Sequence, residues 1–263
     1  MSENIDIIVE KLITLLKGSF EGLKGVIKDE KAGIIVSGGL DSSIIAHLSD
    51  TYLKDSFYLS LAGKDSLDKP FLDILSNHLS HKIEIVDPQS FLKEDVDIVK
   101  EILEKKGIET NLMQMSLGLG FYLLASYAKK VGLKYILTGQ GADEIFGGYT
   151  RYKNYEGDLK EYLKSDYEQI GRIDYKRDRA ILNHFNIELI NPYEEKQFLE
   201  YALLIPPELK LYKQNETIIE KYVLRLVAQK LGLPEEIVWR PKKAFQYSSR
   251  IQKILAAYLG IKI

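Results

Sequence analysis

Residues 32–43 read AGIIVSGGLDSS, and much of the fold follows from them. The first five, Ala32–Val36, are small or apolar and predict a short buried strand. The strand runs into the glycine pair Gly38 and Gly39, and the apolar spacing of Ser42–Lys54 then predicts a helix. We therefore expect a buried strand that meets a helix through a glycine-rich turn.

The same alternation of strands and helices continues on both sides of this turn. Further strands are predicted at Phe57–Leu61, Lys82–Val86 and Lys134–Thr138. Helices are predicted at Ile5–Lys17, Leu67–Leu79, Asp95–Lys105 and Asn111–Val131. Strands that alternate with helices are typical of a parallel sheet covered by helices on both faces. We expect such an α/β fold in residues 1–150.

Beyond Tyr149 the pattern becomes helical. Amphipathic spacing predicts helices at Leu159–Ile170, Arg177–Phe185, Lys196–Leu204, Glu216–Leu231 and Ile251–Leu259. No stretch there predicts a strand, and no linker rich in proline, glycine or serine separates this part from the rest. We expect residues 151–263 to be all-helical, to pack on the sheet and to complete the substrate site.

Composition restricts the classes of function. The 36 basic and 38 acidic residues give a net charge of -2, so no overall positive field would hold the protein on nucleic acid or an anionic membrane. The absence of cysteine excludes disulfides, thiolate metal sites and a cysteine-dependent glutaminase within this polypeptide. Neither a signal-peptide pattern nor an apolar run long enough to span a bilayer is present, which predicts a cytoplasmic protein.

The first glycine-rich turn has the residues of a phosphate-binding site. Gly38 and Gly39 allow the backbone to approach a polyanion, and the helix that follows offers unpaired amides. Asp41 would repel phosphate unless a cation lay between them, which indicates Mg²⁺. The lysine of GxxxxGK[ST] is missing, which disfavours a Walker-type NTPase. Hydroxyl donors are supplied by Ser37, Ser42 and Ser43.

A second glycine-rich turn follows the strand predicted at Lys134–Thr138. Residues 138–149 read TGQGADEIFGGY and carry two carboxylates, Asp143 and Glu144. In an open parallel sheet both turns lie at the carboxyl ends of strands, where ligands bind. Either turn alone would be an ordinary connection with capping serines and first-turn acids. Two such turns, each with an acid, instead favour a nucleotide site with Mg²⁺ on Asp41 and Asp143.

Three segments resemble signatures of known enzymes. The first turn fits the SGGxDS signature of the PP-loop ATP pyrophosphatases, and the second resembles the SGEGxDExFGGY segment of asparagine synthetases. Residues 239–245, WRPKKAF, resemble the WRxKxxF segment of asparagine synthetase and β-lactam synthetase domains. The likeness covers nearly the whole chain, which begins roughly where the synthetase half of those enzymes begins, without their glutaminase domain.

This resemblance implies a sheet of the adenine nucleotide alpha-hydrolase type and a two-step reaction. ATP would adenylate a carboxylate with loss of pyrophosphate, and a nitrogen nucleophile would then attack the acyl-adenylate. Asp41 and Asp143 would bind Mg²⁺, and the catalytic residues would be Asp143, Glu144 and Lys242, with Lys242 neutralising the charge that develops. The implied ATP-binding residues are Val36, Ser37, Gly38, Gly39, Asp41, Ser42, Ser43, Leu61, Thr138, Gly139 and Gln140.

Two positions depart from the asparagine synthetase pattern. Gln140 replaces a glutamate, and an amide can form hydrogen bonds but cannot take a proton. The family's RxPFLD-like segment aligns with residues 190–195, INPYEE, so Ile190 stands where an arginine would clamp a substrate carboxylate. These differences argue against aspartate as the substrate. By position, the candidates for the missing acid are Glu144, Glu194 and Glu195.

Three functions are compatible with these residues. The first is an AMP-forming amide ligase that acts on a small-molecule carboxylate, uses ammonia, an amine or a separate glutaminase subunit, and works alone or as a homo-oligomer. The second is a PP-loop enzyme that adenylates an RNA base, which the acidic net charge and the lack of an RNA-binding module disfavour. The third is a nucleotide-binding regulatory protein without turnover, favoured only by Gln140.

Overall fold

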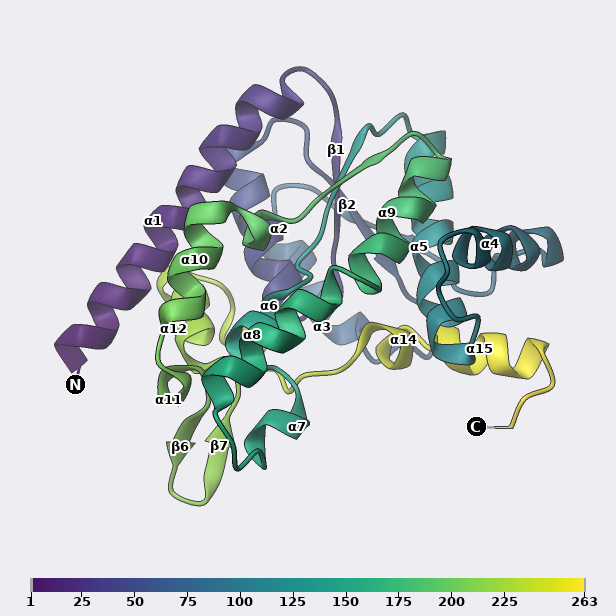
Figure 1. Ribbon diagram of the computed structural model, residues 1–263. Helices are drawn as coiled ribbons and strands as arrows, with labels where there is room; N and C mark the ends of the chain where they lie inside the picture. The colour runs from purple at the N-terminus through teal and green to yellow at the C-terminus, as the bar shows by residue number, and fades with distance from the viewer. Residues whose placement is uncertain (1, 263) are drawn as a thin grey trace.

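The computed structural model describes residues 2–262, in which helices enclose a five-stranded sheet (Figure 1). All neighbouring strands are parallel, in the order β3-β2-β1-β4-β5. The predicted parallel sheet with helices on both faces is therefore confirmed. The strands are β1 (Ala32–Ile35), β2 (Phe57–Leu61), β3 (Ile83–Val86), β4 (Tyr135–Leu137) and β5 (Glu188–Ile190).

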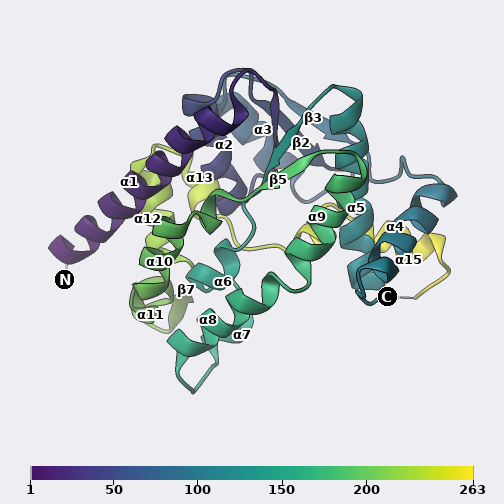
Figure 2. The same cartoon turned by 45° about the horizontal axis from the view of Figure 1, so that its top comes forward.

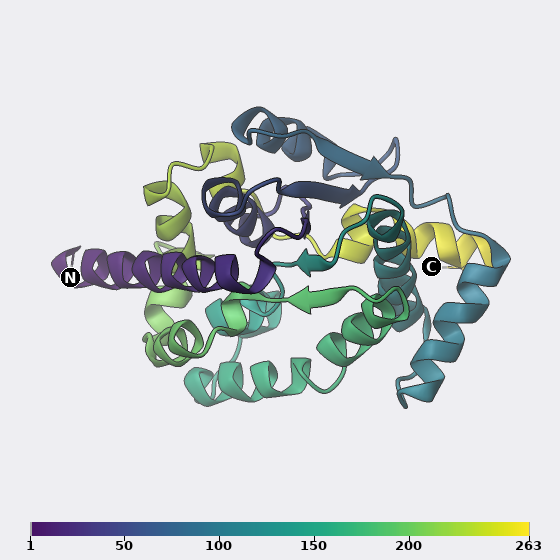
Figure 3. The same cartoon turned by 90° about the horizontal axis from the view of Figure 1, so that it is seen from above.

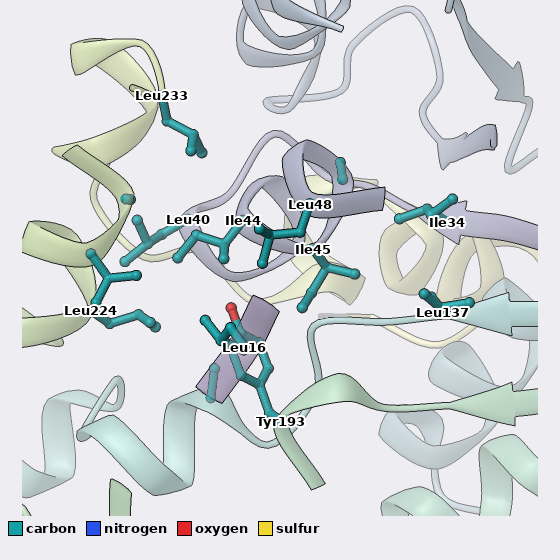
Figure 4. Packing of buried hydrophobic residues seen from close by; sticks show 14 of the residues in the cluster. Leu16, Ile34, Leu40, Ile44, Ile45, Leu48, Leu137, Tyr193, Leu224 and Leu233 are labelled. Atoms are coloured by element: carbon teal, nitrogen blue, oxygen red, sulfur yellow. The ribbon is translucent and has the colours of Figure 1, made fainter. Parts of the chain in front are cut away.

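Successive residues of the central strands point to opposite faces, and separate groups of helices bury the two faces (Figure 3). Ile34 and Leu137 belong to one apolar cluster, which Figure 4 shows from close by, whereas Ile35 and Ile136 belong to the other. The first cluster includes residues of α1 (Ser2–Ile27), α2 (Leu40–Tyr52), α3 (Lys69–His78), α6 (Ala142–Phe146), α10 (Lys196–Leu204), α12 (Tyr222–Lys230) and α13 (Glu235–Val238). The second includes residues of α4 (Lys93–Lys105), α5 (Leu112–Lys130), α9 (Asp174–His184) and α15 (Ile251–Tyr258), with α14 (Phe245–Ser248) packed against it.

Helix α5 is buried along most of its length and carries two glycines that let its neighbours approach. A Cβ at Gly118 would lie 3.0 Å from Val99, and a Cβ at Gly120 would lie 2.7 Å from the ring of Phe245. Close packing at Gly120 therefore brings the C-terminal segment against the middle of the molecule. Within residues 2–262, no helix is both long enough and apolar enough to cross a membrane.

The region after Tyr149 is not all-helical, so that prediction was wrong for three short segments. β5 pairs with β4, which places residues from both sides of position 150 in one sheet (Figure 2). An antiparallel hairpin is formed by β6 (Tyr212–Gln214) and β7 (Thr217–Ile219), the latter inside a predicted helix. Three-residue strands are too short to show a period of two. The remaining elements are α7 (Thr150–Lys153), α8 (Leu159–Ile170), η1 (Pro192–Glu194) and α11 (Pro207–Lys210).

Candidate functional site

An open cavity of about 520 Å³ lies at the carboxyl ends of β1 and β4. Its wall also includes parts of α5 and α9, Lys221 and residues 240–246. Most of the predicted site residues line it: Ser37, Gly39, Asp41, Ser42, Thr138, Gly139, Gln140, Asp143, Glu144 and Lys242. The others are buried and do not belong to the cavity wall: Val36, Gly38, Ser43 and Leu61.

The turn after β1 leaves the start of α2 open toward the cavity. Gly38 has a φ of +65°, and a Cβ on it would lie 2.7 Å from Phe71, so only glycine fits. Gly39 is the N-cap of α2 and provides no side-chain cap. The Ser42 hydroxyl accepts a hydrogen bond from the Ser37 N–H at 3.2 Å and holds the turn closed. The first amides of α2 can therefore bind an anion.

The turn after β4 lies directly against the first turn. A Cβ on Gly139 would lie 2.8 Å from both the carbonyl carbon of Asp41 and the nitrogen of Ser42. Because both neighbours are backbone atoms, a larger residue would push the two turns apart. The glycines thus bring Asp41 and Asp143 to one end of the cavity.

Four charged side chains meet at that end. The Lys221 Nζ lies 2.5 Å from Oδ2 of Asp41 and 2.6 Å from Oδ1 of Asp143. The Lys242 Nζ lies 2.5 Å from Oδ2 of Asp143 and 4.2 Å from the centre of the Tyr149 ring. Lys221 is only 3% exposed, so its positive charge is held inside the protein by the two carboxylates.

Burial and charge shift the pKa values of the two carboxylates in opposite directions. Burial raises the pKa of Asp41, and the charge of Asp143 raises it further against the opposing effect of Lys221. Burial also disfavours ionised Asp143, but Lys221 and Lys242 together outweigh it and lower the pKa of Asp143 to about 2. Asp143 is therefore a carboxylate at neutral pH.

These two acids fit a hard cation. Oδ1 of Asp41 is buried and accepts no hydrogen bond among the described residues. A buried carboxylate oxygen without a donor is rare, and Mg²⁺ is commonly bound by one or two carboxylates together with substrate phosphates. Within residues 2–262, no three His, Asp or Glu side chains form a group that could hold a metal ion. The donor set fits Mg²⁺ that arrives with a nucleotide.

Residues 240–245 are tied to the first turn. Arg240 donates to the Ser37 carbonyl at 2.6 Å and pairs with Asp68 at 2.5 Å. This anchor is buried, since the side chains of Arg240 and Asp68 are 5% and 2% exposed. Arg240 therefore fixes the segment that carries Lys242 to the cavity wall.

Glu144 lies deeper in the wall than Asp143. Its Oε1 accepts a hydrogen bond from the Tyr149 hydroxyl at 2.7 Å, whereas its buried Oε2 has no donor among the described residues. Burial and then the neighbouring charge of Asp143 raise the pKa of Glu144 to about 7. Of the three acids considered as substitutes for the missing glutamate, Glu144 alone lines the cavity.

Residues 190–195 lie outside the cavity wall. Ile190 ends β5 and packs against the first apolar cluster. Glu194 accepts hydrogen bonds from Arg179 at 2.8 Å and from Asn191 at 3.0 Å. Glu195 caps α10 through the Phe198 N–H at 2.9 Å. These contacts hold the segment in place and give neither glutamate a position in the cavity.

Sequence patterns did not reveal Lys221, Arg177 and Asp178. Lys221 precedes α12 inside a stretch predicted as one continuous helix, and its partners lie about 80 and 180 positions earlier. Asp178 accepts a hydrogen bond from Gln140 at 2.5 Å and pairs with Arg177 at 2.7 Å. Spacing within one helix carries no signal for such long-range contacts.

Two solved structures align with most of this chain at low sequence identity. A U34-tRNA thiolase from Methanococcus maripaludis aligns with a TM-score of 0.49 and 15% identity, covering 97% of this chain and 74% of that one. An NMN synthetase from Francisella tularensis aligns with a TM-score of 0.37 and 13% identity, covering 98% and 87%.

Sequence relatives are more informative. A Methanocaldococcus jannaschii protein assigned as a glutamine-hydrolysing asparagine synthetase is 31% identical over 94% of this chain and 50% of its own length. The Lotus japonicus asparagine synthetase 1 is 27% identical over 85% of this chain and 40% of its own. The chain thus spans about half the length of these relatives. The asparagine synthase family model matches residues 24–161 and 153–260. By this match the chain belongs to the asparagine synthase family.

Proposed function

We propose that this protein is an AMP-forming ligase that uses ATP and Mg²⁺ to activate a small-molecule carboxylate and then forms an amide. The observation that carries the proposal is the cluster of Asp41, Asp143, Lys221 and Lys242 beside the open start of α2. Acids for Mg²⁺, lysines for phosphate oxygens and free helix amides occur together at one end of the cavity. Family membership supports the same chemistry.

The triphosphate would lie along the two turns. The amides of α2 and the hydroxyls of Ser37 and Ser42 would bind pyrophosphate, and Asp41 and Asp143 would hold Mg²⁺. When bound, Mg²⁺ would neutralise charge on the phosphate oxygens. Lys221 and Lys242 would turn from the carboxylates toward the same oxygens. Thr138, Gly139 and Gln140 would form the opposite wall.

The first step transfers AMP. A substrate carboxylate oxygen attacks the α-phosphorus of ATP, the bond to the β-phosphate oxygen breaks, and pyrophosphate leaves. Lys242 is suited to stabilise the negative charge of that transition state because it lines the cavity and its side chain is 22% exposed. Glu144 lies one residue from Asp143, and its raised pKa would allow it to exchange a proton near pH 7.

The second step forms the carbon–nitrogen bond. Ammonia or an amine attacks the acyl carbon, AMP leaves, and one proton is released. The relatives are named as glutamine-hydrolysing enzymes, so a separate glutaminase or free ammonia is the nitrogen source that we propose. Residues 1–263 contain no cysteine, so a cysteine-dependent glutaminase would have to lie outside them.

Product analysis tests this function. The protein is incubated with Mg-ATP, ammonium and a panel of carboxylates, and AMP is separated from ADP. We expect AMP and pyrophosphate in equal amounts, formed only with an accepted carboxylate. Asp143→Asn should lower this rate at least about a hundredfold, in line with the loss of one key electrostatic group. ADP and phosphate as the sole products would contradict the proposal.

A further inference from the structure

Part of the cavity wall is apolar and open to solvent. Four residues form it: Met113 and Leu117 of α5, Ile170 at the end of α8, and Ile173 at the N-cap of α9. We call this set the apolar wall. Met113 and Ile173 are 43% and 46% exposed, although both are large apolar side chains. Apolar side chains that line an open cavity are typical of a surface that a ligand covers.

The helices that carry the apolar wall are held together beside the turn after β4. Arg177 of α9 donates to Oε1 of Gln114 at 2.7 Å, which joins the start of α5 to the start of α9. A Cβ on Gly141 would lie 3.5 Å from the ring of Tyr167 in α8 and would clash with the hydroxyl of Tyr175 in α9. Both helices therefore pack against this turn, and the apolar wall stands next to it.

Two arginines of the cavity wall beside α8 and α9 are already paired. Arg177 binds Asp174 through Nη1 and Asp178 through Nε, both at 2.7 Å. Arg151 binds Asp166 through Nη2 at 2.7 Å. Three carboxylates thus face two guanidinium groups, which leaves one negative charge in excess. Neither arginine is free to bind a second anionic group on the substrate, and the excess charge would repel such a group.

The adenine base has a separate apolar surface in the same cavity. Phe121 lies two turns further along α5, about 12 Å from Met113, given the rise per residue of an α-helix. Its ring centre is 6.1 Å from that of Phe245, and both rings line the cavity together with Ile35 of β1. Aromatic rings suit a flat base. The apolar wall at the start of α5 is therefore left for the acid.

We propose that the substrate is a monocarboxylic acid with an apolar chain, and that this chain lies on the apolar wall. The inference rests on the proposed function and names the class of acid that the enzyme activates. The carboxylate must reach the α-phosphorus beside Lys242, so the rest of the acid extends over the part of the cavity that the nucleotide leaves open. There an alkyl or aromatic chain would remove the exposed surface of Met113 and Ile173 from water.

A series of straight-chain acids from acetate to octanoate tests the nature of the chain. ATP–pyrophosphate exchange gives kcat/KM for each acid. We expect kcat/KM to rise roughly fourfold for each methylene group that becomes buried, and to level off once the chain extends past the apolar wall. Acids of equal length that end in an ammonium or in a second carboxylate should lose this gain. A flat series, or a preference for either charged acid, would overturn the proposal.

Ile173→Asn and Met113→Gln test where the chain lies. Each variant replaces apolar surface by an amide of similar size at an exposed position, so both should fold. We expect kcat/KM for the longest accepted acid to fall about tenfold, in line with the burial of part of one large apolar side chain. The kcat/KM for acetate and the Kd for Mg-ATP should stay as in the wild type. Ile7→Asn is the matched control, because Ile7 is 67% exposed on α1, outside the cavity wall.

Failure of this inference and failure of the proposed function give different results. If no acid yields AMP and pyrophosphate, the proposed function fails and the inference falls with it. If acids are activated but the two variants lower kcat/KM for acetate as much as for the longest acid, the apolar wall has only a structural role. A higher Kd for Mg-ATP in these variants would place the adenine base on the apolar wall. Either of these last two results would overturn the inference alone.

Discussion

The Nζ atom of Lys221 lies 2.5 Å from Oδ2 of Asp41, although 180 positions of sequence separate them. The same ammonium lies 2.6 Å from Oδ1 of Asp143. One lysine thus stands between the two carboxylates that we propose as Mg²⁺ ligands. Carboxylates this close in a poorly solvated site repel each other, and the lysine supplies the positive charge that offsets the repulsion. Lysine and metal would therefore stabilise the same pair of acids.

Lys221→Met should destabilise the protein most when Mg²⁺ is absent. Removing the lysine leaves Asp41 without its partner and Asp143 with Lys242 alone, for which we expect a loss of about 2–4 kcal/mol. Millimolar Mg²⁺ should restore part of it, so that the melting temperature of the variant rises more with Mg²⁺ than that of the wild type. Calorimetry with EDTA and with Mg²⁺ measures both quantities. Lys243→Met, at an exposed neighbour of Lys242, is the control. A loss of stability that does not depend on Mg²⁺ would contradict the inference that Lys221 and Mg²⁺ stabilise the same two acids.

Gly139→Ala should weaken nucleotide binding more than it weakens folding. The new Cβ would lie 2.8 Å from backbone atoms of Asp41 and Ser42, so the two turns must separate. We expect at least a tenfold rise in the Kd for Mg-ATP, since a tenfold change corresponds to only about 1.4 kcal/mol. Titration calorimetry measures the Kd of each variant for Mg-ATP.

Gly22→Ala provides the matched control for that substitution. It lies in α1, and a Cβ there would have no atom within 4 Å. Because alanine is favoured over glycine inside a helix by about 0.5–1 kcal/mol, the control should bind Mg-ATP normally and melt slightly higher. Unchanged Mg-ATP binding by Gly139→Ala would show that the nucleotide does not use the junction of the two turns.

The elements around the first turn could be predicted because their signals are local. An apolar run, two glycines and a helical period lie within residues 32–54, and β1 and α2 form there. β5 could not be predicted in the same way. Only its middle residue, Leu189, is buried, and the strand forms by pairing with β4, which is distant in sequence. Motif similarity placed Lys242, which contacts Asp143 at 2.5 Å.

The rest of the site depends on tertiary contacts. Lys221 has a φ of 55° and stands at the N-cap of α12, where helical periodicity gives no special weight to a lysine. In the sequence, Asp178 is one charged residue among several in α9. Only the folded structure shows that it contacts Gln140. The sequence therefore indicates the end of the cavity that the two glycine-rich turns form, where we propose that ATP binds. Lys221, at that same end, and the Arg177–Asp178 pair emerge only from packing.

The stability of the protein should fall as the pH drops below about 6.5, and His47 contributes to this fall. Burial lowers its pKa below 6.5, and His78 lowers it further, with Nδ1 and Nε2 only 3.0 Å apart. The charge of Asp50 opposes the shift and that of Lys17 adds to it. Since the unfolded state takes up this proton first, stability is complete above pH 6.5 and is lost as the pH falls through the folded pKa.

His78→Gln should flatten that pH dependence. Glutamine keeps a hydrogen-bond partner for His47 but cannot become charged, so the pKa of His47 should move back toward 6.5. Urea unfolding at about pH 7.5 and about pH 5.5 gives the difference to compare. His184→Gln changes an exposed histidine on α9 and should leave the slope as in the wild type. If both variants behave alike, the His47–His78 pair is not the source of the effect.

Asp174→Asn should widen the range of carboxylates that the enzyme accepts. In the wild type, Asp174 and Asp178 both bind Arg177, so this side of the cavity carries one more negative than positive charge. A second carboxylate on the substrate would be repelled there, and Asp174, 37% exposed, can be replaced without unpairing Asp178. Removing one charge several ångströms from the substrate carboxylate changes the interaction free energy by about 1 kcal/mol at a half-solvated site. This corresponds to roughly a fivefold change in the relative rate. The ratio of the ATP–pyrophosphate exchange rate with a dicarboxylate to that with the matched monocarboxylate should therefore rise by that factor. Asp97→Asn, on the exposed side of α4, should not change the ratio, and an unchanged ratio in Asp174→Asn would mean that the substrate does not reach Arg177.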